Sequence, residues 1–304
     1  MNDPGLLGRL RCPRCGAGLG PEPAGARCRG CDSAYSEEGG ILGLVAGESG
    51  APGYDPHYFG TLPQVENTHF WFVTRREAIL DALRRAVPDL GARPLFDVGC
   101  GSGGLLEFLS RSGLPLAGAC DAHVEGLRLA RRKLAVPLLL VDEGRLPPLG
   151  PSHAMIGLFD VLEHLDDDRD VLRFVFSVLE PGGILVLTVP AHPFLFDEMD
   201  ELAHHRRRYV RRDLREKLAS AGFEVLRLRH FMAALVPLLL VARGVGRWLP
   251  RRGSARERRD AELRIVPGVN GLLRSLLRLE GLFIRLVPLP FGSSIVAVAR
   301  RPRT

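Results

Sequence analysis

Paired cysteines near the N-terminus have the spacing of a metal site. Cys12-Pro-Arg-Cys15 and Cys28-Arg-Gly-Cys31 are two CxxC pairs separated by twelve residues rich in glycine, proline and alanine. Two intervening residues let both thiolates of a tight turn face one point, and two such turns supply the four sulfur ligands that suit zinc. We therefore expect a structural Zn²⁺ ion held by these four cysteines, with no open catalytic position.

A glycine-rich turn forms the second chemical feature. An apolar run leads into Gly99-Cys100-Gly101-Ser102-Gly103-Gly104, and a helical pattern follows. Glycines let the backbone turn sharply and approach a ligand closely at a helix N-terminus, which predicts a nucleotide cradle. Gly99, Gly101 and Gly104 also satisfy the GxGxxG pattern of NAD-binding folds. Asp121 would hold ribose hydroxyls in either case, so an NAD-dependent oxidoreductase stays open on this turn alone.

Short apolar runs alternating with helical segments must position this turn, and they are typical of a parallel sheet wrapped by helices. Expected strands are Pro94–Val98, Leu116–Cys120, Pro137–Val141, Ala154–Phe159, Ile184–Val189, Phe223–Arg229 and Ser294–Arg300. A helix capped by Asp167 or Asp168 should precede the fifth strand and end at Pro181-Gly182-Gly183. A further helix is expected over residues 212–221. The fold class is α/β and doubly wound.

The order of the strand-end motifs resembles class I S-adenosylmethionine-dependent methyltransferases. Asp97-Val98-Gly99-Cys100-Gly101-Ser102-Gly103 is similar to their first motif. Asp160-Val161-Leu162-Glu163-His164-Leu165 resembles the fourth-strand motif of the subgroup that includes ubiquinone-type enzymes. The resemblance covers roughly residues 70–300. It implies S-adenosylmethionine as cofactor and a Rossmann-like seven-stranded sheet whose last strand is antiparallel.

The resemblance also implies a set of cofactor-binding residues. Asp121 matches the ribose-binding acid, and Asp142 matches the acidic position beside the adenine. Trp71 and Arg75 lie in an aromatic segment that forms a lid over the cofactor in similar proteins, although a hydrophobic plug explains the same segment. The full set is Trp71, Arg75, Asp97, Gly99, Cys100, Gly101, Gly103, Asp121, Ala122, Asp142, Glu143 and Asp160.

Methyl transfer itself asks little of the protein. The sulfonium methyl is already activated, so the main task is to align an acceptor lone pair with it. A base is needed when the acceptor carries a proton. We expect His164, Glu163 and His192 in this role, and each also fits a local packing role. His204, His205 and Tyr209, beside three arginines, could bind metal or phosphate, but a solvated basic face is the simpler interpretation.

Composition and hydropathy limit the class of protein. The chain has 304 residues, 46% apolar and 25% charged, which excludes intrinsic disorder, collagen and a disulfide miniprotein. No apolar run reaches the roughly 18–20 residues that cross a bilayer, and the first residues do not form a secretory signal. We expect a cytoplasmic protein with a zinc ribbon at 1–47, a linker at 48–69 and a methyltransferase domain at 70–304.

The C-terminal third is strongly basic, with 23 basic and 7 acidic side chains in residues 204–304. Within it, a helical insertion at about 231–290 has basic amphipathic character. It fits a substrate lid or dimer interface, peripheral contact with the inner membrane surface, or RNA contact. The favoured function is in-line methyl transfer to a small-molecule or lipid-linked acceptor. Alternatives are an RNA base methyltransferase for ribosomal or transfer RNA and a non-catalytic scaffold. The sequence leaves the acceptor atom and the oligomeric state open.

Overall fold

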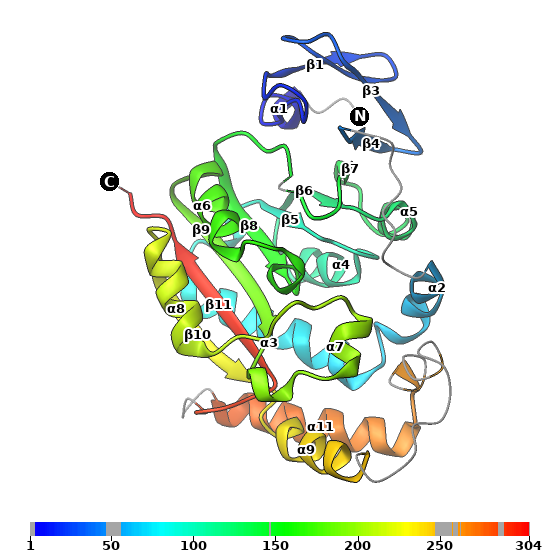
Figure 1. Cartoon of the computed structure of the whole chain (residues 1–304), viewed down its shortest axis with the longest axis vertical. Coiled ribbons are helices and arrows are strands. Elements are labelled where there is room, and N and C mark those ends of the chain that lie inside the picture. Colours follow the sequence, from blue (N-terminus) through cyan, green and yellow to red (C-terminus); the bar gives the residue numbers. More distant parts are fainter. Residues whose placement is uncertain are drawn as a thin grey trace.

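A single mixed β-sheet organises the molecule. The computed structural model describes residues 4–46, 56–145, 147–246, 257, 261, 263–284 and 289–303. Among these residues the sheet has eleven strands in the order β1-β2-β3-β4-β7-β6-β5-β8-β9-β11-β10 (Figure 1). The strands are β1 Leu19–Glu22, β2 Gly25–Cys28, β3 Ala34–Glu38, β4 Ile41–Leu44, β5 Leu95–Val98, β6 Leu116–Asp121, β7 Leu138–Val141, β8 His153–Phe159, β9 Leu179–Pro190, β10 Glu224–Phe231 and β11 Ser294–Arg300.

The centre of the sheet is parallel. Strands β7, β6, β5, β8 and β9 run in one direction, whereas β11 is antiparallel to both β9 and β10. The carboxyl ends of the parallel strands therefore meet at one edge. In parallel α/β sheets that edge carries the ligand site.

Helices cover both faces because successive strand residues point to opposite sides. On β8, Met155 belongs to the cluster with α3, α4, α5 and α11, and Ile156 belongs to the cluster with α6 and α8. The helices are α1 Pro4–Leu7, α2 Pro56–Val65, α3 Phe70–Ala86, α4 Gly104–Arg111, α5 Val124–Arg131, α6 Asp168–Val178, α7 Glu198–Leu202, α8 Arg211–Ser220, α9 Leu235–Gly246 and α11 Pro267–Ile284. Short 3₁₀ turns are η1 Leu90–Ala92, η2 Leu162–His164 and η3 Pro193–Leu195.

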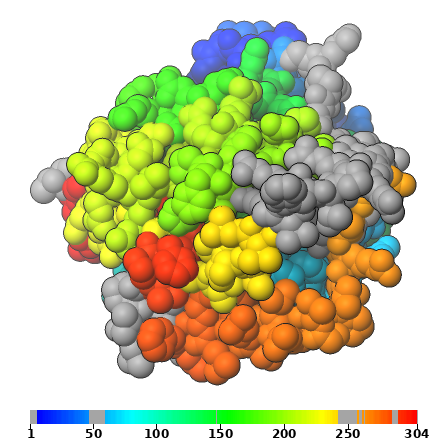
Figure 2. All heavy atoms as spheres, turned by 60° about the horizontal axis from the view of Figure 1, so that its bottom comes forward, coloured from blue at the N-terminus to red at the C-terminus, as the bar shows by residue number. Residues whose placement is uncertain are grey.

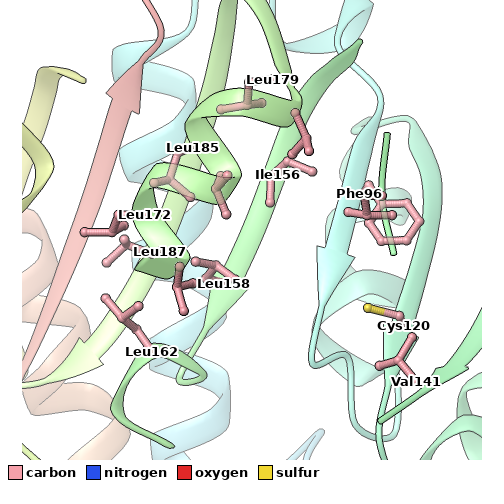
Figure 3. Close-up of a cluster of buried hydrophobic side chains, with 14 of the residues drawn as sticks. Phe96, Cys120, Val141, Ile156, Leu158, Leu162, Leu172, Leu179, Leu185 and Leu187 are labelled. Carbon is pink, nitrogen blue, oxygen red and sulfur yellow. The ribbon is translucent and has the colours of Figure 1, made fainter. Parts of the chain in front are cut away.

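Tight apolar packing fixes the strand ends that carry the site. Figure 3 shows Leu172 of α6 near Leu185 and Leu187 of β9, and all three are fully buried. Burying one such side chain contributes about 1.5–3 kcal/mol. Packing of this kind fixes the positions of β8 and β9, and so it fixes the site residues at their carboxyl ends.

The N-terminal segment extends the sheet, so the count is eleven rather than the expected seven. Strand β4 pairs in parallel with β7, from Ile41 opposite Leu138 to Leu44 opposite Val141. Strands β1 to β3 then follow β4 in antiparallel order. These strands have only four or five residues. Segments so short and rich in glycine carry little strand signal, which is why the sequence did not predict them.

The start of β9 also differs from expectation. Helix α6 ends at Val178, and β9 begins at Leu179, so Pro181-Gly182-Gly183 lies within the strand. The backbone N–H of Gly182 donates to the carbonyl of Arg301, and the N–H of Arg301 donates to the carbonyl of Gly183. Pairing with the end of the chain therefore holds this segment in the sheet, with Gly182 in the left-handed region at φ of 81°.

Helices α9 and α11 make up the described part of the insertion and lie at the bottom of Figure 1. Among the described residues, no helix combines the length and hydropathy required to cross a bilayer. Seven arginines of the insertion fall outside the described residues, at positions 247, 251, 252, 256, 258, 259 and 285.

Candidate cofactor and active site

The glycine turn between β5 and α4 has the conformation that its sequence suggests. Gly101 and Gly103 adopt φ of 52° and 75°, a left-handed region that favours glycine. The backbone N–H of Gly101 donates a 2.7 Å hydrogen bond to Oδ2 of Asp121. A Cβ placed on Gly101 would meet no described atom within 4 Å. The turn is therefore tied to the next strand while its outer side stays open for a ligand.

Asp121, at the end of β6, anchors a second backbone group. Its Oδ1 accepts a 2.8 Å hydrogen bond from the N–H of His123. The His123 ring lies 3.2 Å from the same oxygen, and this hydrogen bond raises the pKa of His123. Each carboxylate oxygen has two lone pairs, so Asp121 can hold the turn and still accept from ribose hydroxyls.

Asp97 provides a buried acceptor at the same edge. It is 2% exposed, and its Oδ1 has no hydrogen-bond partner among the described residues. Burial raises the pKa of Asp97 well above its usual range; Arg75 opposes this rise and Asp121 adds to it. Unsatisfied buried oxygens are rare and costly. This oxygen fits a cationic or hydrogen-bond-donating ligand group beside the glycine turn.

Arg75 reaches from α3 to the ends of two strands. Its guanidinium lies 2.6 Å from Oδ2 of Asp160, after β8, and 3.3 Å from the hydroxyl of Thr188 in β9. It also lies 5.3 Å from the Trp71 ring centre, and Trp71 packs against the apolar cluster beneath α3. Trp71 thus packs as the alternative of a hydrophobic plug predicts. Arg75 lies at the carboxyl ends of the parallel strands, where the ligand site is expected.

The remaining predicted cofactor residues occupy different positions. Asp142 follows β7, and its Oδ2 accepts a 3.0 Å hydrogen bond from the N–H of Ala46. Glu143 is exposed beside it, and Ala122 is half-buried after β6. Burial raises the pKa of the Cys100 thiol well above its usual range, which makes that thiol a poor nucleophile.

Glu66 is a site residue that the sequence did not reveal. It follows α2, inside the segment expected to be a linker, and is buried. Its carboxylate accepts from the hydroxyl of Ser102, at 2.6 Å, and pairs with Lys133. A Cβ on Gly104 would lie 2.3 Å from a Glu66 oxygen. Glu66 therefore closes over the start of α4, and its partners lie 36 and 67 residues away, where no local pattern could indicate them.

Glu163 is the most deeply buried of the predicted catalytic residues. It lies in η2 and is fully buried, and neither carboxyl oxygen has a hydrogen-bond partner among the described residues. Burial, and then the nearby Asp160 carboxylate, raise the pKa of Glu163 well above its usual range. The Nε2 atom of His205 lies 3.9 Å from its Oε1.

His205 is oriented by Asp200, which lies in the first turn of α7. The Nδ1 atom of His205 is 2.8 Å from Oδ1 of Asp200, and Nε of Arg208 donates to both oxygens of that carboxylate at 2.9 Å. Burial disfavours the Asp200 anion, but these partners outweigh it and lower the pKa of Asp200. A carboxylate on Nδ1 fixes the tautomer that leaves Nε2 as an acceptor, and Nε2 faces Glu163.

The other two predicted catalytic residues differ in placement. His164 joins the cluster, since its ring centre is 4.8 Å from that of His205. Burial lowers the pKa of His164 to about 4. His192 follows β9 instead and stacks on His230, with ring centres 5.1 Å apart. The structure thus brings His164 and Glu163 together with His205 and places His192 in a separate pair.

Within the described ranges, two groups of side chains could hold a metal ion. The ligand atoms of Cys12, Cys15, Cys28 and Cys31 all lie within 4.8 Å of one another, and so do those of Glu163, His164 and His205. In the cysteine group, the sulfurs of Cys12 and Cys31 are 3.6 Å apart, and those of Cys15 and Cys28 are 3.4 Å apart. Zinc–sulfur bonds of about 2.3 Å in a tetrahedron place the sulfurs about 3.8 Å apart. The cysteine geometry therefore fits zinc.

Comparison with known proteins identifies the family. A family model described as "Methyltransferase domain" matches residues 65–228, which is more than half of the chain. The chain belongs to this methyltransferase family.

Individual relatives cover the chain in part. An S-adenosylmethionine-dependent methyltransferase of Mycolicibacterium smegmatis is 28% identical over 175 residues, which are 54% of this chain and 63% of the relative. The ubiquinone biosynthesis O-methyltransferase of Marinobacter nauticus is 28% identical over 167 residues, which are 46% of this chain and 67% of that protein. The chain therefore spans slightly less than two thirds of the first of these relatives.

A solved structure shows the same fold. Phosphoethanolamine N-methyltransferase 2 of Haemonchus contortus, in complex with S-adenosyl-L-methionine, matches with a TM-score of 0.53 at 16% identity. The match covers 83% of this chain and 58% of that one. The α/β Rossmann-like methyltransferase fold expected from the motif order is confirmed.

Proposed function

We propose that this protein is an S-adenosylmethionine-dependent methyltransferase that transfers a methyl group to a small-molecule or lipid-linked acceptor. The observation that carries the proposal is the open glycine turn, whose Gly101 N–H donates to Asp121. Beside it, Oδ1 of Asp97 has no hydrogen-bond partner in the described part of the chain. The names of two relatives support the reaction class. An intact turn with both acidic strand ends argues against a non-catalytic scaffold.

Each of these groups has a defined task toward the cofactor. Asp121 would accept from the ribose hydroxyls, and Asp142 lies where the adenine side is expected. Asp97 would face the methionine part of the cofactor, which would donate a hydrogen bond to its buried oxygen. The positive charge of Arg75 favours the ionised form of Asp97. Gly101 must lack a side chain so that the backbone can approach the ligand. Glu66 accepts from the hydroxyl of Ser102 and so fixes the part of the turn where α4 begins.

The bound cofactor supplies an activated methyl on a sulfonium. The protein must then align the acceptor, exclude water and receive a proton where the acceptor has one. Asp200, His205 and Glu163 form the array that suits the last task, because His205 Nε2 faces inward and its other nitrogen is held by a carboxylate. A neutral His164 lines the same cluster. This arrangement favours an acceptor hydroxyl, in keeping with the name of the O-methyltransferase relative from Marinobacter nauticus.

We further propose that residues 1–47 form a zinc ribbon. Four sulfurs within 4.8 Å of one another support this, and two backbone N–H groups, of Gly30 and Cys31, point at the sulfur of Cys28. N–H groups of this kind stabilise metal-bound thiolates. The ion would link the two cysteine turns, and its binding would add to the stability that buried Leu10, Leu19 and Leu42 give this segment.

RNA is a weaker acceptor class on this structure. The arginines near Tyr209 gave part of the reason to consider it, but they are engaged: Arg206 pairs with Asp166, Arg207 with Asp168, and Arg208 with Asp200. Paired cations have less to gain from phosphates. A gel shift with transfer RNA at low salt tests this directly, because phosphate contacts weaken steeply as salt rises.

Transfer of a labelled methyl group tests the proposed reaction. The full-length protein would be incubated with methyl-labelled S-adenosylmethionine and with a phenol, a carboxylic acid or an amine, each with a short or a long alkyl chain. We expect labelled product with a hydroxyl acceptor, and loss of that product in His205→Asn while cofactor affinity is retained. Label on the amine alone would contradict the proton-accepting role of the cluster.

A further inference from the structure

Helix α11 exposes a continuous apolar stripe. Val269, Leu272, Leu276, Leu279 and Phe283 recur at intervals of three and four residues, so they lie along one side of the helix. Their exposed fractions run from 41% for Leu276 to 69% for Leu272. Leu238, Leu240 and Val241 of α9 are also exposed. Figure 2 shows α9 in yellow and α11 in orange, side by side on one face of the molecule.

Contacts on the inner side of α11 fix the orientation of the helix about its own axis. The apolar stripe lies on the opposite side and therefore faces outward. Leu277 is 1% exposed beneath the helix. The side chain of Asn270 accepts from the N–H of Phe70, at 2.7 Å, and the Glu280 carboxylate accepts from the N–H groups of Ala233 and Ala234. These polar contacts tie the helix to α3 and to the start of α9 with the apolar side out.

The charge of this face selects its partner. Glu280 is the only acidic residue of α11, and its carboxylate is occupied by backbone donors. Arg264 is exposed before the helix, and Arg278 is exposed on it with its guanidinium paired to Glu77. The sequence from the end of α9 to the start of α11 is also basic, with eight arginines and three acidic residues at positions 243–264. Apolar side chains beside arginines suit an anionic lipid surface, whereas two copies of such a face repel each other.

The face also borders the acceptor side of the site. Phe231 at the end of β10 lies opposite Ser294 of β11, which lies opposite Pro190 at the carboxyl end of β9. Helix α9 begins four residues after β10. Three exposed phenylalanines flank this junction: Phe194, Phe196 and Phe291. The apolar face thus continues to the edge where the acceptor would enter.

We propose that α9 and α11 dock the protein on the surface of an anionic phospholipid bilayer, without crossing it, and so present the site to a lipid-linked acceptor. The docking stands on the exposed face alone, and the identity of the acceptor rests on the proposed methyltransferase function.

Vesicle flotation of the full-length protein tests the docking. Vesicles of phosphatidylglycerol or of phosphatidylcholine would be compared at low and high salt, without cofactor. We expect binding to phosphatidylglycerol that weakens with salt, and little binding to phosphatidylcholine. The double variant Leu272→Gln with Leu279→Gln should lower the partition coefficient by about tenfold for each leucine. Val210→Gln, an exposed apolar residue at the start of α8, is the matched control and should bind like the wild type.

A second variant keeps the test valid if the double leucine variant fails to fold. Ser275→Asp adds a negative charge to an exposed position of α11 without removing apolar surface, and it should also weaken binding to phosphatidylglycerol. Light scattering gives the oligomeric state of each protein. Absence of binding to phosphatidylglycerol, or a wild-type dimer that the double variant splits, would overturn the docking. Cofactor affinity is measured separately: if it persists while vesicle binding is absent, only the docking fails, and if it is absent while vesicles bind as described, only the methyltransferase function fails.

Discussion

The backbone N–H of Gly101 and the Oδ2 of Asp121 are joined by a 2.7 Å hydrogen bond across two neighbouring strand ends. Asp121 also accepts from the N–H of His123, so one buried carboxylate fixes both the glycine turn and the start of α5. We propose that the same carboxylate also accepts from the ribose hydroxyls of the cofactor. A substitution of Asp121 should therefore change both the conformation of the glycine turn and the affinity for the cofactor.

Replacing Asp121 with Asn should lower the affinity for S-adenosylmethionine by about 10- to 100-fold. The amide has a single acceptor atom, so either Gly101 or His123 loses its partner, and hydrogen bonds to charged groups contribute about 1.5–3 kcal/mol. Titration calorimetry measures the change. Asp170→Asn, at an exposed carboxylate of α6, is the control and should leave the affinity unaltered. Equal affinities for Asp121→Asn and wild type would refute the assigned role.

Replacing Gly101 with Val should abolish detectable binding of the cofactor while the fold persists. The new side chain would fill the open space over the turn, where no described atom lies within 4 Å of a Cβ. Backbone strain is matched by Gly39→Val, because Gly39 has φ of 58° and equally open surroundings in the turn before β4. Both variants should lose similar stability on heating, and only the first should lose binding. Retained affinity in Gly101→Val would contradict the assigned cradle.

Removing the proposed zinc ion should loosen the N-terminal segment selectively. Hydrogen exchange should accelerate in residues 4–46 and stay slow in β8 and β9, since the ion contributes folding free energy only locally. A smaller effect, a several-fold loss of cofactor affinity, should follow because β4 pairs with β7 and Ala46 donates to Asp142. Cys31→Ser should reproduce both effects. Unchanged protection after verified metal loss would show that the cysteines have no such role.

Acidification should destabilise the protein in part through His153. Burial, and then the charge of Arg9, lower the pKa of His153 to about 4 from the ordinary 6.5. Between these values the unfolded chain binds a proton at this residue and the folded chain does not, so stability falls as the pH decreases from about 6.5 to 4. Unfolding in urea at several pH values measures this. The loss should be smaller in His153→Leu, and parallel curves for the two proteins would contradict the prediction.

Local patterns predicted the parts of the site that are local in sequence. The glycine turn, Asp121 and the last strand, Ser294–Arg300, follow from residues adjacent to one another. Glu66 acts on residues that only the tertiary fold brings close, so no spacing indicated it. Asp200 is only five residues from His205, but no motif in the sequence marks this pair. The interpretation of residues 204–209 as a solvated basic face was wrong for Arg208 and Tyr209. Arg208 lies against Asp200, and Tyr209 is 1% exposed and donates to Asp168.

The most direct test of the central claim is titration calorimetry of the full-length protein with S-adenosylmethionine and, separately, with NADH. The open turn beside Asp97 and Asp121 predicts saturable binding of S-adenosylmethionine at one site per chain and no binding of NADH. Absence of heat and of retained ligand at millimolar S-adenosylmethionine, with the protein folded and monodisperse, would contradict the proposed function.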